Sequence, residues 1–93
     1  MDYQWDERKD FSNYKKHGVT FEEAKTTWFD KRGIELFDPI HSVTEDRFLR
    51  IAYSMLGRLL LTSFIERNEG AVIRIISSRE ATKQERLIYE ERI

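Results

Sequence analysis

The chain contains two histidines, His17 and His41, and of these His17 is the candidate for proton transfer. Imidazole changes its charge near neutral pH, so His17 is our first candidate for a proton carrier. Lys16, Glu66 and Tyr89 are further candidates. An alternative interpretation of His17 is structural, because a histidine before Gly18 at a predicted helix end interacts favourably with the negative end of the helix dipole.

Arginine is concentrated in one part of the chain. Residues 47–79 contain six arginines, no lysine and two acidic residues, so this segment carries a charge of +4 although the whole chain carries −1. The planar guanidinium group recognises phosphate or carboxylate through paired hydrogen bonds. Arg79 is the strongest candidate because it ends a predicted strand just before a helix cap. Arg58 and Arg67 flank turns, and a solvated sheet face is the alternative interpretation of the segment.

Histidine, lysine and arginine together suit cleavage of RNA through its own 2′-hydroxyl group. This reaction needs a base, an acid and fixed cations near the phosphate, and arginine serves only the last role because it keeps its proton. We hypothesise that Arg79 and Arg58 hold the scissile phosphate while His17 or a nearby lysine transfers the proton. Arg47 and Arg67 would then hold flanking phosphates.

Other catalytic signatures are missing from the sequence. It has no phosphate-binding glycine-rich loop, no nucleophile elbow and no HExxH helix. Without cysteine, two histidines separated by a predicted helix and strand are weak support for zinc, so we expect no metal and no other cofactor.

Local signals predict an α+β fold with two N-terminal helices, an antiparallel sheet of about four strands and one C-terminal helix. Asp6 caps the first helix, which follows a short strand and ends at His17-Gly18. The capping-box spacing of Thr20 and Glu23 starts a second helix that runs to about Phe29, and Thr82 starts the last helix. The expected strands of the sheet are Ile34–Phe37, Arg47–Ser54, Arg58–Glu66 and Ala71–Ser78.

The alternation of side chains along these strands sorts them into two faces. One face is apolar, and we assign to it Leu59, Leu61, Ile65, Ile73 and Ile75. The other is mixed and includes Arg58 and Arg74, so we assign Arg74 to RNA binding. The second helix is expected to bury a stripe of Phe21, Ala24, Trp28 and Phe29. Trp5, Trp28 and Phe48 are interpreted as core residues rather than as platforms for stacked bases.

Length and composition indicate one domain over residues 1–93, with 40% apolar and 35% charged residues. The longest apolar stretch, within residues 59–65, is far shorter than the roughly 18 residues of a membrane span. The acidic N-terminus lacks the apolar centre of a secretory signal. We therefore expect no membrane association and a cytoplasmic location, which the lack of cysteine also suits.

Motifs at both ends of the chain resemble those of the BrnT toxin family. The N-terminal motif runs from Trp5 to Lys9 and continues with Asn13 and Lys16–Ala24. The C-terminal motif runs from Arg74 to Arg86 and continues with Tyr89-Glu90, with Ser78 where the family often has alanine. Between them, matching pieces occur in order: Asp38-Pro39, His41-Ser42, Glu45–Phe48 and Gly57–Leu60.

The resemblance implies a RelE-like ribonuclease fold and a toxin that blocks translation by cleaving RNA. It also implies a BrnA-type antitoxin with a ribbon-helix-helix DNA-binding domain, so that operator DNA is contacted only through the antitoxin. Matching positions that we select as site residues are Lys9, Lys16, His17, Arg47, Arg58, Arg67 and Arg79, followed by Glu66 and Tyr89. The alternatives are a non-catalytic RNA-binding or protein-interaction module and a purely structural partner in a complex.

Overall fold

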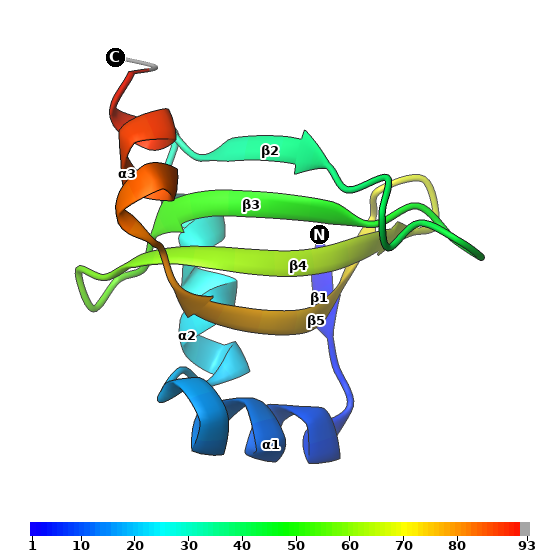
Figure 1. The fold of residues 1–93 in the computed structure, drawn as a ribbon. Coiled ribbons are helices and arrows are strands. Elements are labelled where there is room, and N and C mark those ends of the chain that lie inside the picture. The colour runs from blue at the N-terminus through cyan, green and yellow to red at the C-terminus, as the bar shows by residue number, and fades with distance from the viewer. Residues whose placement is uncertain (92–93) are drawn as a thin grey trace.

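A computed structural model describes residues 1–91, which form a twisted sheet with helices on both faces (Figure 1). The elements, in chain order, are β1 (Asp2–Gln4), α1 (Glu7–His17), α2 (Phe21–Lys25), the 3-10 helix η1 (Thr26–Phe29), β2 (Ile34–Phe37), β3 (Phe48–Tyr53), β4 (Leu59–Arg67), β5 (Val72–Glu80) and α3 (Lys83–Glu90). The strand order in the sheet is β1-β5-β4-β3-β2. The predicted α+β fold is confirmed.

The predicted sheet of about four strands is one strand short. Strands β2 to β5 form the expected antiparallel meander, but β1 pairs in parallel with β5 and makes the sheet five-stranded and mixed. Tyr3 holds β1 in place by packing its ring edge-on against Trp28, with 5.5 Å between the ring centroids. The expected short strand before the first helix is therefore present as an edge strand of the sheet.

Helix caps follow the sequence closely. The Asp6 carboxylate accepts a hydrogen bond from the Arg8 backbone N–H, and Gly18 ends α1 in the left-handed conformation with φ of 69°. The Thr20 hydroxyl accepts from the Glu23 N–H, as predicted. The Glu23 side chain does not complete this capping box, because it instead binds Arg58 and Ser54.

The second helical segment reaches Phe29, as predicted, but it is not α-helical throughout. It is α-helical only to Lys25 and continues as the 3-10 helix η1. Thr26 and Thr27 donate their hydroxyls to the carbonyls of Glu23 and Ala24, at 2.6 and 2.7 Å, and such back-bonding slightly destabilises and bends an α-helix. Phe29 does not join the buried stripe as predicted, since its side chain is exposed.

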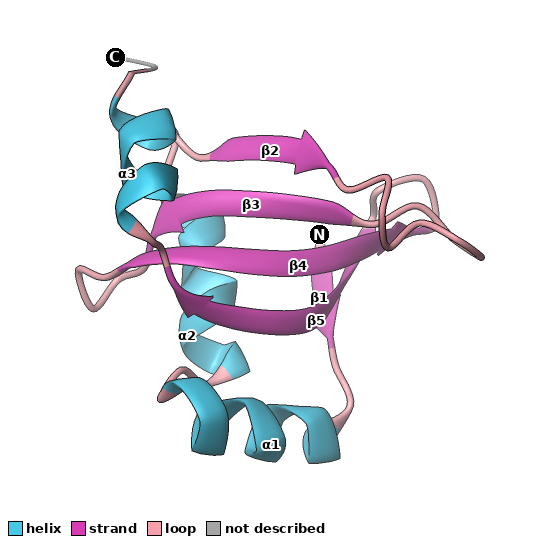
Figure 2. Ribbon diagram, in the orientation of Figure 1, coloured by secondary structure: helices cyan, strands magenta, loops and turns pink. Residues whose placement is uncertain are grey.

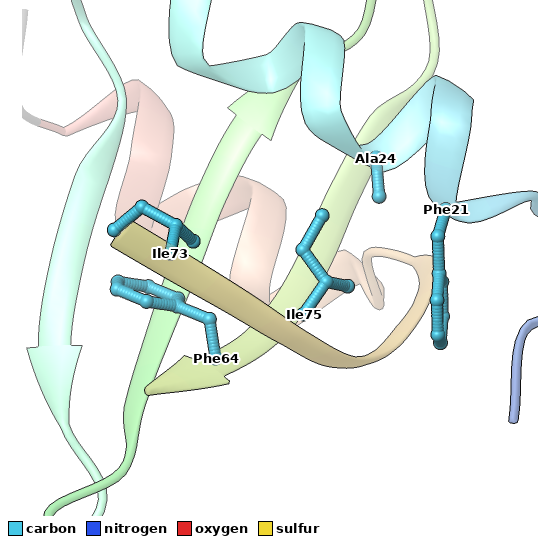
Figure 3. Close-up of a cluster of buried hydrophobic side chains, with 5 residues drawn as sticks. All are labelled: Phe21, Ala24, Phe64, Ile73 and Ile75. Carbon is cyan, nitrogen blue, oxygen red and sulfur yellow. The ribbon is translucent and has the colours of Figure 1, made fainter. Parts of the chain in front are cut away.

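The two faces of the sheet bury separate apolar clusters. Phe21 and Ala24 of α2 pack against Phe64 of β4 and against Ile73 and Ile75 of β5 (Figure 3). Trp5, Trp28 and Phe48 pack against this cluster, which confirms their interpretation as core residues. Tyr89 of α3 packs on the opposite face with a second set: Ile34, Ile51 and Leu59.

The assignment of residues to faces is wrong for β5. Ile73 and Ile75 lie with Phe64 under α2, not with Leu59 and Leu61. The cause is a bulge. Ser63 pairs with Ser77 while Phe64 pairs with Ile75, so Ile76 is an extra residue that reverses the alternation along β5.

Helix α3 begins with the full capping box predicted for Thr82 and Glu85. It lies across one end of the sheet, and the loop between β2 and β3 lies at the other end (Figure 2). None of the helices in residues 1–91 is long and apolar enough to cross a membrane.

Candidate functional site

A hollow lies on the face of the sheet that carries α3, and we call it the sheet groove. It encloses about 250 Å³ and is lined by His17, Asp38, His41, Arg47, Leu49, Leu61, Ser63, Ser77, Ser78 and Arg79. The lining comes from the end of α1, from the β2–β3 loop and from β3, β4 and β5. Three of the predicted site residues, His17, Arg47 and Arg79, therefore meet in one place.

The bulge in β5 gives this groove its polar floor. Directly opposed residues on paired strands point to the same face, so the pairs Leu61–Arg79 and Ser63–Ser77 place four side chains together. Without the extra residue Ile76, Ser77 and Arg79 would share the face of Ile73 and Ile75. Because of the bulge, the aliphatic residues Ile73 and Ile75 face the core, whereas Ser77 and Arg79 face the groove.

Arg79 is held by a carboxylate from α3. Its two terminal nitrogens donate to the two oxygens of Glu85 at 2.8 and 2.9 Å, and Nη1 also donates to the Glu80 carbonyl at 3.2 Å. The Arg79 hydrogen bonds hold the pKa of Glu85 below its ordinary value, and Glu85 in turn raises the pKa of Arg79. A guanidinium has five N–H groups, so its Nε–Nη2 edge keeps two for a ligand.

His17 is placed by a buried amide one turn earlier in α1. Asn13 donates to the carbonyls of Val19 and Ser78, at 2.9 and 2.8 Å, and accepts from the Ser78 N–H at 3.0 Å. These bonds tie the end of α1 to β5. Gly18 then turns the chain away with positive φ, so His17 is the last helical residue beside the groove.

A second hollow of about 210 Å³ adjoins the sheet groove, and we call it the α1 hollow. Its lining comprises Lys9, Ser12, Asn13, Lys16, His17, Ile76 and Ser77, of which His17 and Ser77 are shared with the sheet groove. Lys9 and Lys16 are seven residues apart, or about two helical turns, and so lie on one face of α1. Two further predicted residues thus extend the cationic surface beyond His17.

The sequence interpretation missed Asp38 and His41 as site residues. Both line the sheet groove, and the Nδ1 atom of His41 lies 2.8 Å from a carboxylate oxygen of Asp38. His41 was considered only as a metal ligand. The spacing Asp-x-x-His around Pro39 was the available signal, because a proline turn brings residues three apart into contact.

Arg58 does not line either hollow. It donates to the carboxylate of Glu23 through Nε at 2.9 Å and also through Nη2, and to the Gly18 carbonyl at 3.0 Å. Glu23 is buried, and the Arg58 hydrogen bonds keep its pKa below the ordinary value despite that burial. Arg58 therefore braces the β3–β4 turn against α2.

The other predicted site residues also lie outside both hollows. Tyr89 is buried beneath α3 and donates to Asp30 at 2.7 Å; burial, and this bond to Asp30, raise its pKa to about 12. Glu66 is exposed near the end of β4. Arg67 approaches Glu45 at 3.8 Å, and Arg74 donates to Gln4 at 3.1 Å.

The six arginines of residues 47–79 are less free than their sequence positions suggest. Arg50 is buried, binds Glu35 and the carbonyls of Thr27 and Asp30, and leaves no room for a side chain at Gly33. Arg58, Arg67 and Arg79 also face carboxylates. Much of the +4 charge is therefore neutralised inside the fold.

No group of three or more His, Cys, Asp or Glu side chains that could hold a metal ion occurs within residues 1–91.

Comparison with solved structures shows that the fold is that of a small bacterial ribonuclease toxin. The crystal structure of the Brucella abortus ribonuclease toxin BrnT, at 1.1 Å resolution, matches with a TM-score of 0.64 and 24% sequence identity, over 89% of this chain and 99% of that chain. A comparison of the sequence with curated proteins gives no match.

The chain belongs to the BrnT family, described as the ribonuclease toxin of a type II toxin–antitoxin system, because the family model matches residues 5–85. The resemblance noted in the sequence is confirmed.

Proposed function

We propose that this protein is a metal-independent endoribonuclease toxin that inhibits translation by cutting RNA in the sheet groove. The observation that carries the proposal is the meeting of His17, Arg47 and Arg79 in one hollow of a chain from a ribonuclease toxin family. The protein works in the cytoplasm and keeps a RelE-like arrangement of the sheet.

The groove provides the groups that cleavage through the 2′-hydroxyl requires. The Nε–Nη2 edge of Arg79, fixed by Glu85, binds two oxygens of the scissile phosphate as negative charge builds on them. Arg47 binds the phosphate from the β2–β3 loop. His17 transfers a proton at the reacting oxygen, since imidazole carries a proton in either direction near neutral pH.

RNA continues from the sheet groove into the α1 hollow. Lys9 and Lys16 there bind a flanking phosphate, because the two hollows share His17 and Ser77. Arg74 contacts only longer RNA, beyond the bulge, and Arg67 lies farther along at the end of β4. The roles first given to Arg58, Glu66 and Tyr89 have no support from their positions.

The type II family implies an antitoxin, and we assign a BrnA-type antitoxin with a ribbon-helix-helix DNA-binding domain. The toxin reaches operator DNA only through this partner. Neutralisation then consists of blocking RNA cleavage.

The test is cleavage of a labelled total RNA pool by the purified protein in EDTA. We expect wild-type protein to cut, Arg79→Ala to lose at least about 100-fold in rate, and the adjacent operon product to stop cutting. Arg8→Ala is the matched control, because this arginine is almost fully exposed on α1. Thermal melts establish that each variant is folded.

Two results would overturn the proposal. Cutting by folded Arg79→Ala at the wild-type rate would remove the groove from the mechanism. If the wild type cuts no RNA either without ribosomes or with ribosomes added, the result would instead support a non-catalytic RNA-binding or protein-interaction module.

A further inference from the structure

A second imidazole faces the sheet groove from the side opposite α1. His41 belongs to the β2–β3 loop, whereas His17 ends α1, and both line the same hollow with Arg47 and Arg79. A reaction that takes a proton from one oxygen and gives one to another needs two proton carriers. The sheet groove contains two imidazoles, one for each of these proton transfers.

The hydrogen bond between His41 and Asp38 settles which ring nitrogen is free. An ionised carboxylate only accepts hydrogen bonds, so the Nδ1 atom of His41 carries the proton that bridges the 2.8 Å to Asp38. The Nε2 atom then has its lone pair available. Among the described residues it has no hydrogen-bond partner.

The Asp38 carboxylate is well suited to stabilise a charged imidazole. Its side chain is only 11% exposed, whereas the His41 ring is 63% exposed to the groove and solvent. A carboxylate shielded from water interacts more strongly with the imidazolium that forms when Nε2 accepts a proton. The pair therefore has an inner orienting group and an outer reactive group.

Backbone contacts fix the loop that carries this pair. The Ser42 hydroxyl donates to the Asp38 carbonyl at 2.6 Å and accepts from the Arg47 N–H at 2.9 Å. The Asp38 N–H donates to the Arg47 carbonyl at 2.9 Å. The loop thus closes on itself and holds His41 and Arg47 in a constant relation.

We propose that His41 is the general base of RNA cleavage, oriented by Asp38, and that His17 is the general acid. This inference rests on the proposed function. His17 suits the acid role because the C-terminal end of α1, with its unpaired carbonyls, favours a cation. His41 suits the base role because Asp38 stabilises the charge that it gains.

Nε2 of His41 removes the proton from the 2′-oxygen, which attacks phosphorus and forms a 2′,3′-cyclic phosphate. The bond from phosphorus to the 5′-oxygen breaks, and His17 donates a proton to that oxygen. Arg47 and Arg79 neutralise the charge on the phosphate oxygens meanwhile.

The central variant is His41→Asn, because the asparagine amide nitrogen takes the place of Nδ1 and keeps the hydrogen bond to Asp38. The loop remains braced but the base is lost. With an RNA oligomer containing a mapped cleavage site, we expect kcat to fall about 100- to 10,000-fold. KM should change little.

A second substrate separates the acid from the base. In an oligomer with sulfur in place of the bridging 5′-oxygen, the leaving group departs without a proton. This substrate should restore cleavage by His17→Ala but not by His41→Asn. Restoration of His41→Asn alone, or of both variants, would overturn the assignment of the base.

The role of Asp38 is to position His41, and the kinetics of Asp38→Asn test it. The neutral amide no longer stabilises the imidazolium that forms during the reaction, so kcat should fall while KM changes little. The oligomer with sulfur at the 5′ position should not restore this variant. An unchanged kcat would contradict this role.

Failure of this inference is distinguishable from failure of the proposed function. If wild-type protein and His41→Asn cut equally while His17→Ala does not cut, the ribonuclease stands and His41 only braces the loop. If wild-type protein does not cut RNA at all, the proposed function itself has failed.

Discussion

The side chain of Asn13 binds both backbone groups of Ser78. Its amide nitrogen donates to the Ser78 carbonyl, and its oxygen accepts from the Ser78 N–H. Strand β1 pairs only with residues 72–74 of β5, so Asn13 occupies the edge of β5 where a neighbouring strand would otherwise bond. One amide thus covers an open strand edge and anchors the end of α1 beside the groove.

Asn13→Ala should lower the free energy of unfolding by about 1–3 kcal/mol, because it leaves buried backbone groups of Val19 and Ser78 without partners. RNA cleavage should fall further than stability explains, since His17 loses its anchor. Urea unfolding and cleavage rates check both effects. Ser12→Ala, at the exposed neighbouring position, is the control for stability, and equal losses in the two variants would refute the anchoring role.

Much of the fold follows from local signals in the sequence. Three helix starts were predicted correctly at Asp6, Thr20 and Thr82, because a cap depends on residues within one turn. The four-strand meander was predicted because its strands are long and separated by turns. The three-residue strand β1 could be expected, but its parallel pairing with β5 could not, since no local residue specifies a partner seventy positions away.

The bulge explains the principal error in the faces of the sheet. Strict alternation places Ile73, Ile75, Ser77 and Arg79 on one face. The doublets Ile75-Ile76 and Ser77-Ser78 interrupt that alternation and were the available signal for a bulge. Without the bulge, the apolar residues Ile73 and Ile75 and the polar residues Ser77 and Arg79 would all lie on the same face of the sheet.

The candidate site was predicted in part. His17, Arg47, Arg79, Lys9 and Lys16 meet at two adjoining hollows. Arg58 was expected there too, but its partner Glu23 lies 35 residues away in the sequence, and turn position alone does not reveal such a pairing. His41 was missed as a proton carrier because its role depends on how the β2–β3 loop folds.

Adjacent lysines on α1 provide a matched test of the RNA path. Lys16 lines the α1 hollow, whereas the Lys15 ammonium lies 5.0 Å from the ring centroid of Phe11 and lines neither hollow. Lys16→Ala should weaken binding of an RNA with a 2′-O-methyl group at the cleavage site. The slope of log K against log salt should become shallower by about 0.7, the value for one phosphate contact on a single strand.

Lys15→Ala changes the net charge equally and should leave affinity and slope unchanged. Equal effects of the two substitutions would mean that binding depends on overall charge rather than on the α1 hollow. Binding titrations at several salt concentrations provide both quantities.

The pair of buried Glu23 and partly buried Arg58 predicts a loss of stability in acid. Hydrogen bonds from Arg58 are the main reason that the pKa of Glu23 lies below its ordinary value of 4.5. A carboxyl whose pKa is lowered in the folded state stabilises the fold fully above its unfolded pKa and loses that contribution as pH falls through the folded pKa. Stability should therefore decline below about pH 4.5.

Glu23→Gln should flatten this decline, measured as the free energy of unfolding between about pH 6 and about pH 3. At neutral pH the variant should be less stable than wild type by about 1–3 kcal/mol, because Arg58 loses its charged acceptor. Glu22→Gln is the matched control, since that neighbouring glutamate is exposed. A wild-type acid response in Glu23→Gln would show that other carboxyl groups govern it.

The contacts of Tyr89 indicate a structural role rather than the catalytic role first predicted for it. Its hydroxyl donates to Asp30 at 2.7 Å, and its ring packs edge-on against Tyr53 at 5.4 Å between centroids. Because burial, with this hydrogen bond, raises the pKa of Tyr89 from 10.0 to about 12, the protonated form stabilises the fold. That contribution is complete below about pH 10 and is lost as pH rises through about 12.

Tyr89→Phe should therefore lower the free energy of unfolding by about 1–3 kcal/mol at neutral pH, since a partly buried hydrogen bond to a carboxylate is lost while the ring remains. RNA cleavage at a temperature where the variant is folded should stay at the wild-type rate, because the hydroxyl binds Asp30 under α3 and lines neither hollow. Tyr53→Phe is the control, as its more exposed hydroxyl only accepts a bond from Arg86 and should affect stability little. A folded Tyr89→Phe that no longer cuts RNA would instead make Tyr89 a proton carrier, and would move the reaction away from the sheet groove.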